Sequence, residues 1–159
     1  MLGDKVVFVG AIAVLSYLGW GYRSTKDIDM ALASGTPPEY LEERGFRRVK
    51  ETLYSPGGFK VDVYTKEVNG VPVDELFRES VVVRVGRTEI RVPRLEHLLV
   101  TKLTGRHQDV EDLRTLLWKH GASVDWSYLK ERYLWAYPEL RRIYSAVSGG
   151  GSARTRSNF

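Results

Sequence analysis

Apolar and polar side chains alternate along residues 27–32 of this chain. Successive side chains of a β-strand point to opposite faces, so an alternation of this kind predicts a strand that is apolar on one face and polar on the other. Asp27 and Asp29 would then share the polar face. The same alternation along residues 59–65 predicts a second strand, with Asp62 on its polar face.

The remaining pattern predicts strands and short helices in the first part of the chain and helices from about residue 93 onward. A β-branched run at 5–9 is stopped by Gly10 and predicts a buried strand, after which residues 11–18 have helical spacing. We expect the further strands at 46–54, 81–85 and 89–92 and the further helices at 36–44, 74–77, 93–104, 108–120, 126–135 and 138–147.

These elements predict one α+β domain over residues 1–147, with a helical C-terminal half and a flexible tail at 148–159. The length of 159 residues is that of one domain. The chain has no cysteine, which excludes disulfides, thiolate metal sites and cysteine nucleophiles. No apolar stretch reaches the roughly 20 residues of a membrane span and no signal peptide is recognisable, so we expect a cytoplasmic protein without a membrane partner.

The three aspartates are the strongest candidates for chemistry. Two aspartates two residues apart on a strand project from one face, and Asp62 joins Asp27 and Asp29 if its strand lies beside theirs. Three carboxylates in a small space repel one another unless a cation neutralises them, and Mg²⁺ prefers such oxygen ligands. The alternative is that these are solvent-facing residues of amphipathic strands.

A turn from strand to helix at Gly10 and Ala11 is the second candidate feature. The N–H groups at a helix N-terminus, together with the helix dipole, favour a bound phosphate. An ordinary connection between a strand and a helix would explain the same residues. The net charge of +4 and the pI near 9.3 permit a polyanionic partner without establishing one.

The ordered series of these motifs resembles the minimal nucleotidyltransferase superfamily, whose core is shared with DNA polymerase beta, and within it the AbiEii-like branch that includes bacterial toxins. The resemblance covers roughly residues 6–117 and rests on Gly10-Ala11, the segment 23–30, and Asp62 between valines. A later segment, 98–113, resembles the branch's lysine-bearing helix and the acids that follow it. The resemblance implies a mixed β-sheet flanked by helices.

The resemblance also implies an activity, the transfer of a nucleoside monophosphate from a nucleoside triphosphate such as ATP to a hydroxyl. Asp27, Asp29 and Asp62 would bind two Mg²⁺ ions, and Asp62 would accept the proton of the attacking hydroxyl. Lys102 would contact the triphosphate and Asp109 would orient the lysine or a substrate group. A lysine that extends to water at the rim of its helix, and an acid that favours a helix start, are the alternatives for these two.

The acceptor implied by the branch is an RNA end such as tRNA, in a toxin-like setting with an antitoxin-like protein partner. A protein side chain or a small molecule of the aminoglycoside type are alternative acceptors, and a non-catalytic nucleotide- or nucleic-acid-binding module is the alternative class. Two departures bear on activity. Ala11 replaces the second glycine or serine of the turn, and few residues precede the first strand, where many relatives have a helix that forms part of the cleft.

Several residues have less specific roles. Arg23 and Thr25, just before the acidic strand, could touch phosphate or support the turn, or be a surface cation and a strand-entry threonine. The three histidines have no metal-ligand spacing, so we expect them at the surface or rim. Aromatic and basic residues interleave after residue 126, which fits base stacking but is better explained by core aromatics beside a solvated basic face.

Overall fold

The computed structural model of the protein describes residues 2–37 and 39–150 and has an α+β fold with a mixed sheet and a helical C-terminal part, as the sequence predicts. The chain divides after Arg94 into two compact units. This boundary lies next to residue 93, where the sequence pattern changes to helices. The first unit carries the sheet and the second is helical.

The first unit is organised around one five-stranded sheet. Its central strands, β2 and β5, are parallel, and each other neighbouring pair is antiparallel, so the sheet is mixed. The chain must therefore cross over the sheet between β2 and β5. In spatial order the strands are β1 (Val6–Val9), β2 (Asp27–Leu32), β5 (Lys60–Tyr64), β4 (Thr52–Tyr54) and β3 (Arg47–Val49).

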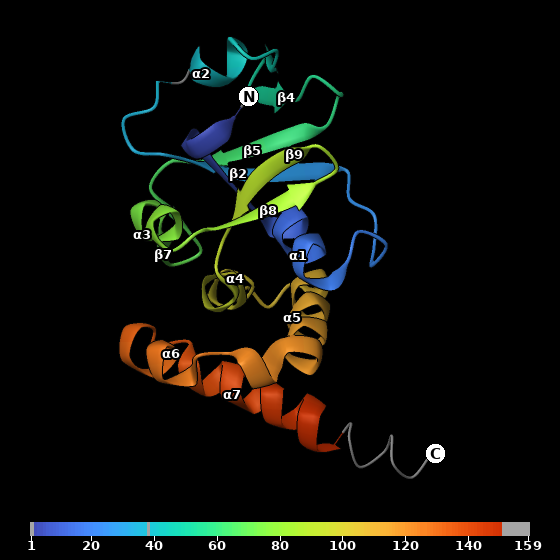
Figure 1. The fold of residues 1–159 in the computed structure, drawn as a ribbon, viewed down its shortest axis with the longest axis vertical. Helices are drawn as coiled ribbons and strands as arrows, with labels where there is room; N and C mark the ends of the chain where they lie inside the picture. Colours follow the sequence, from blue (N-terminus) through green and yellow to red (C-terminus); the bar gives the residue numbers. More distant parts are fainter. Residues whose placement is uncertain (1, 38, 151–159) are drawn as a thin grey trace. The chain divides into compact units, whose positions relative to one another are not determined.

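Helices lie on both sides of the sheet (Figure 1). On one side, the apolar positions of β1, β2 and β5 pack with Leu41 of α2 (Glu39–Glu42) and with Phe46 in a buried cluster. On the other side, α1 (Gly10–Leu18) follows β1 directly and buries Ala13, Val14 and Leu15. The predicted helix at 36–44 is thus much shorter than expected, and the chain after Glu42 forms turns.

Two tight turns distinguish the observed strands from the predicted ones. The expected strand at 46–54 is wrong as one element, because the chain reverses between β3 and β4 with Lys50 at φ +57°. A hairpin that the pattern did not predict joins β6 (Glu67–Val68) to β7 (Val71–Pro72). Its Asn-Gly turn, in which both residues have positive φ, is a recognised hairpin signal.

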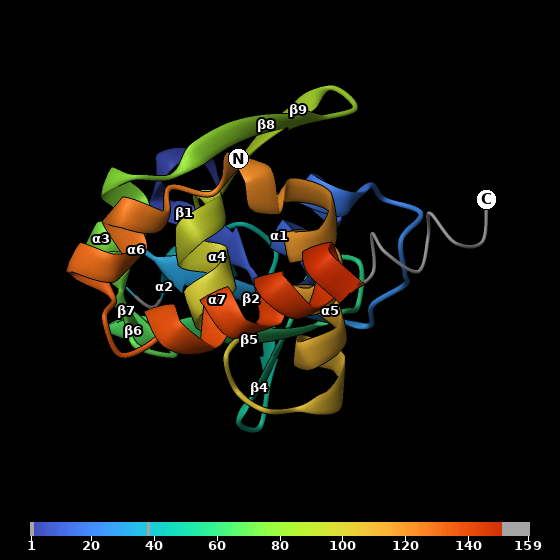
Figure 2. The same cartoon turned by 90° about the horizontal axis from the view of Figure 1, so that it is seen from below.

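The first unit is completed by η1 (Gly3–Lys5), by α3 (Val73–Arg78), and by the antiparallel strands β8 (Val81–Val85) and β9 (Thr88–Val92). Figure 2 shows β8 and β9 as a two-stranded ribbon. Strand β9 packs beside β1 and η1. The helix and the hairpin confirm the predictions at 74–77, 81–85 and 89–92 within a residue or two.

The second unit consists of short helices, of which α7 packs on α5 and α6. They are α4 (Leu95–Thr101), α5 (His107–His120), η2 (Gly121–Ser123), α6 (Trp126–Arg132), α7 (Tyr137–Ser145) and the π-helical turn η3 (Ala146–Gly150). Residues 148–150 are therefore helical instead of part of a tail, and 151–159 lie outside the described residues. Across the described chain, no helix has the length and apolar content needed to cross a bilayer.

Candidate functional site

The pairing of β2 with β5 brings the three aspartates to one face of the first unit's sheet. Asp29 is the register partner of Asp62, and Asp27 is the partner of Lys60. Register partners on neighbouring strands project from the same face, and Asp27 shares that face with Asp29 because they are two residues apart. The sequence predicts that Asp62 joins Asp27 and Asp29 if its strand lies beside theirs, and the structure has the two strands side by side.

The apolar neighbours fix the direction of these acids. Ile28 is the register partner of Val61, and both contribute to the apolar cluster on the opposite face. A one-residue slip of β5 would turn Val61 to the polar side and Asp62 into the core, so burial of the valine determines where the acid points. Asp62 and Asp27 are exposed and Asp29 is half-buried.

The turn at the start of α1 lies against one of these carboxylates. Gly10 has φ +58°, and a Cβ added to it would lie 2.3 Å from Oδ2 of Asp29. No side chain fits at that distance, so the glycine lets the Asp29 carboxylate reach the beginning of the helix. Ala11 follows as the second residue of α1 and is buried. The strand, the turn and the helix N-terminus that the sequence predicts therefore meet the acidic face at Asp29.

Gly10→Ala should lower the free energy of unfolding by more than the backbone penalty alone. A left-handed conformation costs an L-residue about 1–2 kcal/mol, and here the new methyl group also displaces Asp29. The matched control is Gly86→Ala, because Gly86 has a similar φ of +61° but nothing within 4 Å of an added Cβ. Urea denaturation measures both variants, and equal losses would contradict the proposed crowding at Asp29.

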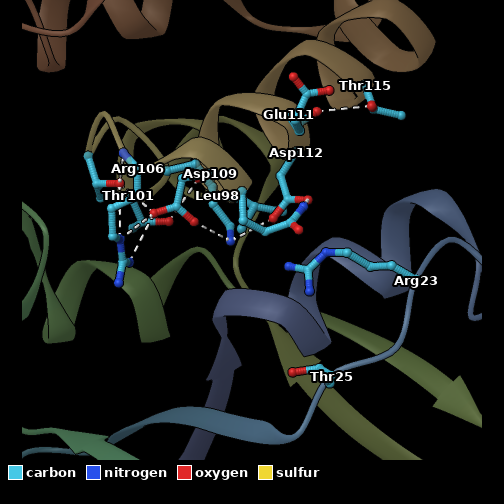
Figure 3. A network of polar contacts seen from close by, with 12 residues as sticks. Arg23, Thr25, Leu98, Thr101, Arg106, Asp109, Glu111, Asp112 and Thr115 are labelled. Atoms are coloured by element: carbon cyan, nitrogen blue, oxygen red, sulfur yellow. Dashed lines mark hydrogen bonds and ion pairs between the residues drawn. The ribbon is translucent and has the colours of Figure 1, made fainter.

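The segment that enters β2 is held by Thr25. Its hydroxyl donates to the carbonyl of Asp27 at 3.0 Å and accepts from the Asp27 N–H at 3.3 Å. Arg23 donates to the carbonyl of Ser24 at 3.4 Å. Both side chains project from the loop before the strand (Figure 3). Thr25 therefore makes the contacts of a residue that positions the first acid of the pair.

The residues present fit a divalent cation by donor type and by face. Carboxylates from two adjacent strands are the oxygen ligands that Mg²⁺ prefers. The missing Cβ of Gly10 gives Asp29 a place beside the helix N-terminus. In residues 2–37 and 39–150, no three acidic or imidazole side chains are gathered closely enough to hold an ion without adjustment. Binding of a cation would therefore require the acidic side chains of this face to move closer together.

The second unit contains a separate ionic network centred on Lys102. The Lys102 ammonium donates to Oδ1 of Asp109 at 3.0 Å and to Oδ2 of Asp112 at 2.9 Å, and all three side chains are almost fully buried. The alternative in which this lysine extends to water is therefore wrong. Gln108 donates to the other oxygen of Asp112 at 3.0 Å. Figure 3 shows the two acids projecting from α5 into the network.

Asp109 accepts hydrogen bonds from Lys102, Thr104 and Arg106. Burial alone would raise the pKa of its carboxyl. Hydrogen bonds from Thr104 and Lys102, with the positive charges of Lys102 and of a neighbouring arginine, outweigh burial and hold the pKa below its ordinary value. That arginine is Arg106, whose guanidinium lies 2.9 Å from Oδ2 of Asp109. Asp109 therefore stays ionised at neutral pH and makes the contact by which an acid orients a lysine.

Two features of the second unit were not foreseen. The sequence pattern includes Asp112 only among the acids that follow the lysine-bearing helix, whereas the structure shows it fully buried against Lys102. The signal was its spacing of three from Asp109, which places both acids on one face of α5. His97 was expected at the surface or rim, but it is fully buried and its Nε2 lies 2.7 Å from the Tyr128 hydroxyl.

The aromatic and basic residues after residue 126 pack on one another. Trp126 stacks on Tyr144 with ring centroids 5.3 Å apart, and the Arg141 guanidinium lies 4.7 Å from the Trp126 centroid. Protein groups therefore already contact these rings. The arrangement agrees with the interpretation of packed aromatics beside basic side chains.

In comparisons with known proteins, no family model matched the sequence and no curated protein matched it. The fold and the site define an α+β protein whose mixed five-stranded sheet has three aspartates on one face.

Proposed function

We propose that this chain is a metal-dependent nucleotidyltransferase, which moves a nucleoside monophosphate from a nucleoside triphosphate to a hydroxyl and releases pyrophosphate. One observation carries the proposal, the parallel pairing that sets Asp29 beside Asp62 with Asp27 on the same face. The approach of Asp29 to the start of α1 supports it, because the helix N-terminus is a favourable place for phosphate next to the acids.

In the proposed reaction the acceptor hydroxyl oxygen forms a bond to the α-phosphorus. The bond from that phosphorus to the oxygen bridging it to the β-phosphate breaks, and the electron pair leaves with pyrophosphate. Asp62 accepts the hydroxyl proton and later returns it to water. The first N–H groups of α1, from Gly10 onward, bind the oxygens of the leaving phosphates.

Asp27, Asp29 and Asp62 would hold Mg²⁺, two ions in the complete site. When bound, the metal neutralises the phosphate oxygens and aligns the entering and leaving oxygens. The protein's own contribution is to fix three carboxylates on adjacent strands. Thr25 secures the backbone of Asp27, and the apolar partners of β2 and β5 set the direction of the acids. Phosphate contacts from Arg23 and Lys102 stay predictions.

The acceptor that we propose is an RNA end such as tRNA, in a cytoplasmic, toxin-like setting with an antitoxin-like protein partner. An aminoglycoside-type small molecule is the alternative acceptor. The second candidate function is a nucleotide- or nucleic-acid-binding module without turnover. It is favoured by the spacing of the acids, which are not drawn together into a ready-made ion site in the described chain.

Thermal unfolding with each of ATP, CTP, GTP and UTP, with and without Mg²⁺, tests the proposal. At a hundredfold excess over Kd, a nucleotide that binds the folded state should raise Tm by about 5–10 °C. The rise should require Mg²⁺ and should be lost in Asp27→Ala/Asp29→Ala. Asp4→Ala/Glu67→Ala is the matched control, since it removes two exposed acids outside β2 and β5. An equal rise in the Asp27/Asp29 variant would reject the metal-dependent site.

A further inference from the structure

A row of side chains crosses the sheet from its outer edge to the acids. Arg47 is the register partner of Tyr54, Tyr54 of Lys60, and Lys60 of Asp27. Register partners project from one face, so these residues lie on the same face as the proposed active site. We call Arg47, Tyr54 and Lys60 the cationic row.

The cationic row is open to solvent. Arg47 and Lys60 are exposed and Tyr54 is half-buried. Within the described chain neither cation makes an ion pair with an acidic side chain, unlike Arg84, Arg94 and the lysine of the second unit. Val49, on the same face of the edge strand, is 49% exposed. Two cations are thus available to an external anion.

The chemistry of the row matches a single-stranded nucleic acid. Neighbouring strands lie about 4.8 Å apart, so the backbones of Arg47 and Lys60 lie roughly 10 Å apart, on either side of Tyr54. Cations that neutralise successive phosphates, with an aromatic ring on which a base stacks, are the elements by which proteins bind single strands. An acidic peptide would use the cations but would gain little from the ring.

We propose that the cationic row binds the acceptor, a single-stranded polynucleotide, and leads its terminal hydroxyl to Asp27 and Asp62. The role of that hydroxyl as the acceptor rests on the proposed function, but binding of the strand to the cationic row can be tested without assuming that function. Lys60 lies directly beside Asp27, so the phosphate that it holds is the last one before the reacting end.

Fluorescence anisotropy with a labelled single strand of roughly 12 nucleotides, in Mg²⁺ buffer without nucleoside triphosphate, measures the interaction. For Arg47→Ala/Lys60→Ala we expect at least tenfold weaker binding, and a slope of log K against log salt that is smaller by about 1.4, since each phosphate contact contributes about 0.7. Tyr54→Leu should weaken binding roughly 5- to 150-fold with an unchanged slope.

The matched control is Arg48→Ala/Lys66→Ala. Arg48 is the exposed neighbour of Arg47 on the opposite face, and Lys66 is an exposed lysine beyond the end of β5, so the net charge changes equally. This control should bind as the wild type does. If it loses as much affinity as the Arg47/Lys60 variant, only the overall charge matters and the proposal is overturned.

Further arms separate the remaining outcomes. Comparing the affinities for an RNA strand and a DNA strand of the same sequence shows which of the two polynucleotides the cationic row prefers. Equal affinity for a polyglutamate peptide, with no effect of Tyr54→Leu, would instead assign the row to an acidic protein and overturn the proposal. If the strand binds through the row but no nucleotide is transferred, the proposed enzyme fails and the row stands. Full transfer by the Arg47/Lys60 variant would reject the row alone.

Discussion

Asp62→Asn should reduce nucleotidyl transfer by about three orders of magnitude while the protein stays folded. The amide has the shape of the carboxylate but carries no charge, so it neither binds a cation strongly nor accepts the hydroxyl proton. Several kcal/mol of transition-state stabilisation then disappear, at 1.4 kcal/mol for each tenfold change in rate. Transfer of labelled nucleotide to total RNA provides the measurement.

The control for this variant is Glu67→Gln, which converts an exposed acid of the first unit to its amide away from β2 and β5. It should transfer at the wild-type rate. Because Asp62 is exposed on its strand, both variants should unfold at the wild-type urea concentration. An Asp62→Asn protein that keeps more than a tenth of the wild-type rate would remove this carboxylate from the proposed reaction.

Lys102→Met should be the most destabilising substitution considered, with a loss of about 3–5 kcal/mol in the free energy of unfolding at neutral pH. Methionine keeps the length of the side chain but leaves the buried carboxylates of Asp109 and Asp112 without the ammonium between them. Urea denaturation measures the loss. Lys130→Met, which removes an exposed lysine of α6, is the control and should change stability little.

The pH dependence identifies the cause of this loss. In the wild type the pKa of Asp109 is lowered, so the stability from its ion pairs is present above the ordinary aspartate pKa and is lost as pH falls through the lower, folded value. In Lys102→Met, two carboxylates repel and the pKa of one rises, so its destabilisation grows as pH rises above about 4. The difference between the proteins should therefore shrink toward pH 4. Lys102→Met/Asp112→Leu should recover part of the stability, and a deficit independent of pH would contradict the electrostatic cause.

Local alternation was sufficient to predict the acidic strands. The pattern around Asp27 and Asp29 predicts β2 with its observed bounds, and the valines around Asp62 predict β5. Adjacent residues of a strand point to opposite faces, so the polar and the apolar face can be predicted from the local sequence without knowing the rest of the sheet. Gly10 was likewise predictable, because a glycine between a β-branched run and a helical pattern marks the turn.

Contacts between distant segments were not predictable in the same way. The sequence of β2 does not indicate that β5 is its neighbour in the sheet, because β3 and β4 lie between the two strands in the sequence. The ion pair of the buried acid Asp112 was not predictable, because its partner Lys102 reaches it only after the turn between α4 and α5. The break at Lys50 was missed because the residue is neither glycine nor asparagine, the usual residues with positive φ.

The crossover between β2 and β5 has a consequence for how the protein is made. Parallel neighbours cannot be joined by a tight hairpin. The connection between β2 and β5 therefore contains α2, β3 and β4, which precede β5 in the chain. Bringing β2 and β5 together closes a long loop, which lowers the conformational entropy of the chain. This loss is compensated only when the contacts between the two strands form. A nascent chain that has emerged only as far as β4 therefore has two of the three acids and no strand to supply the third. The proposed reaction therefore requires that β5 has paired with β2.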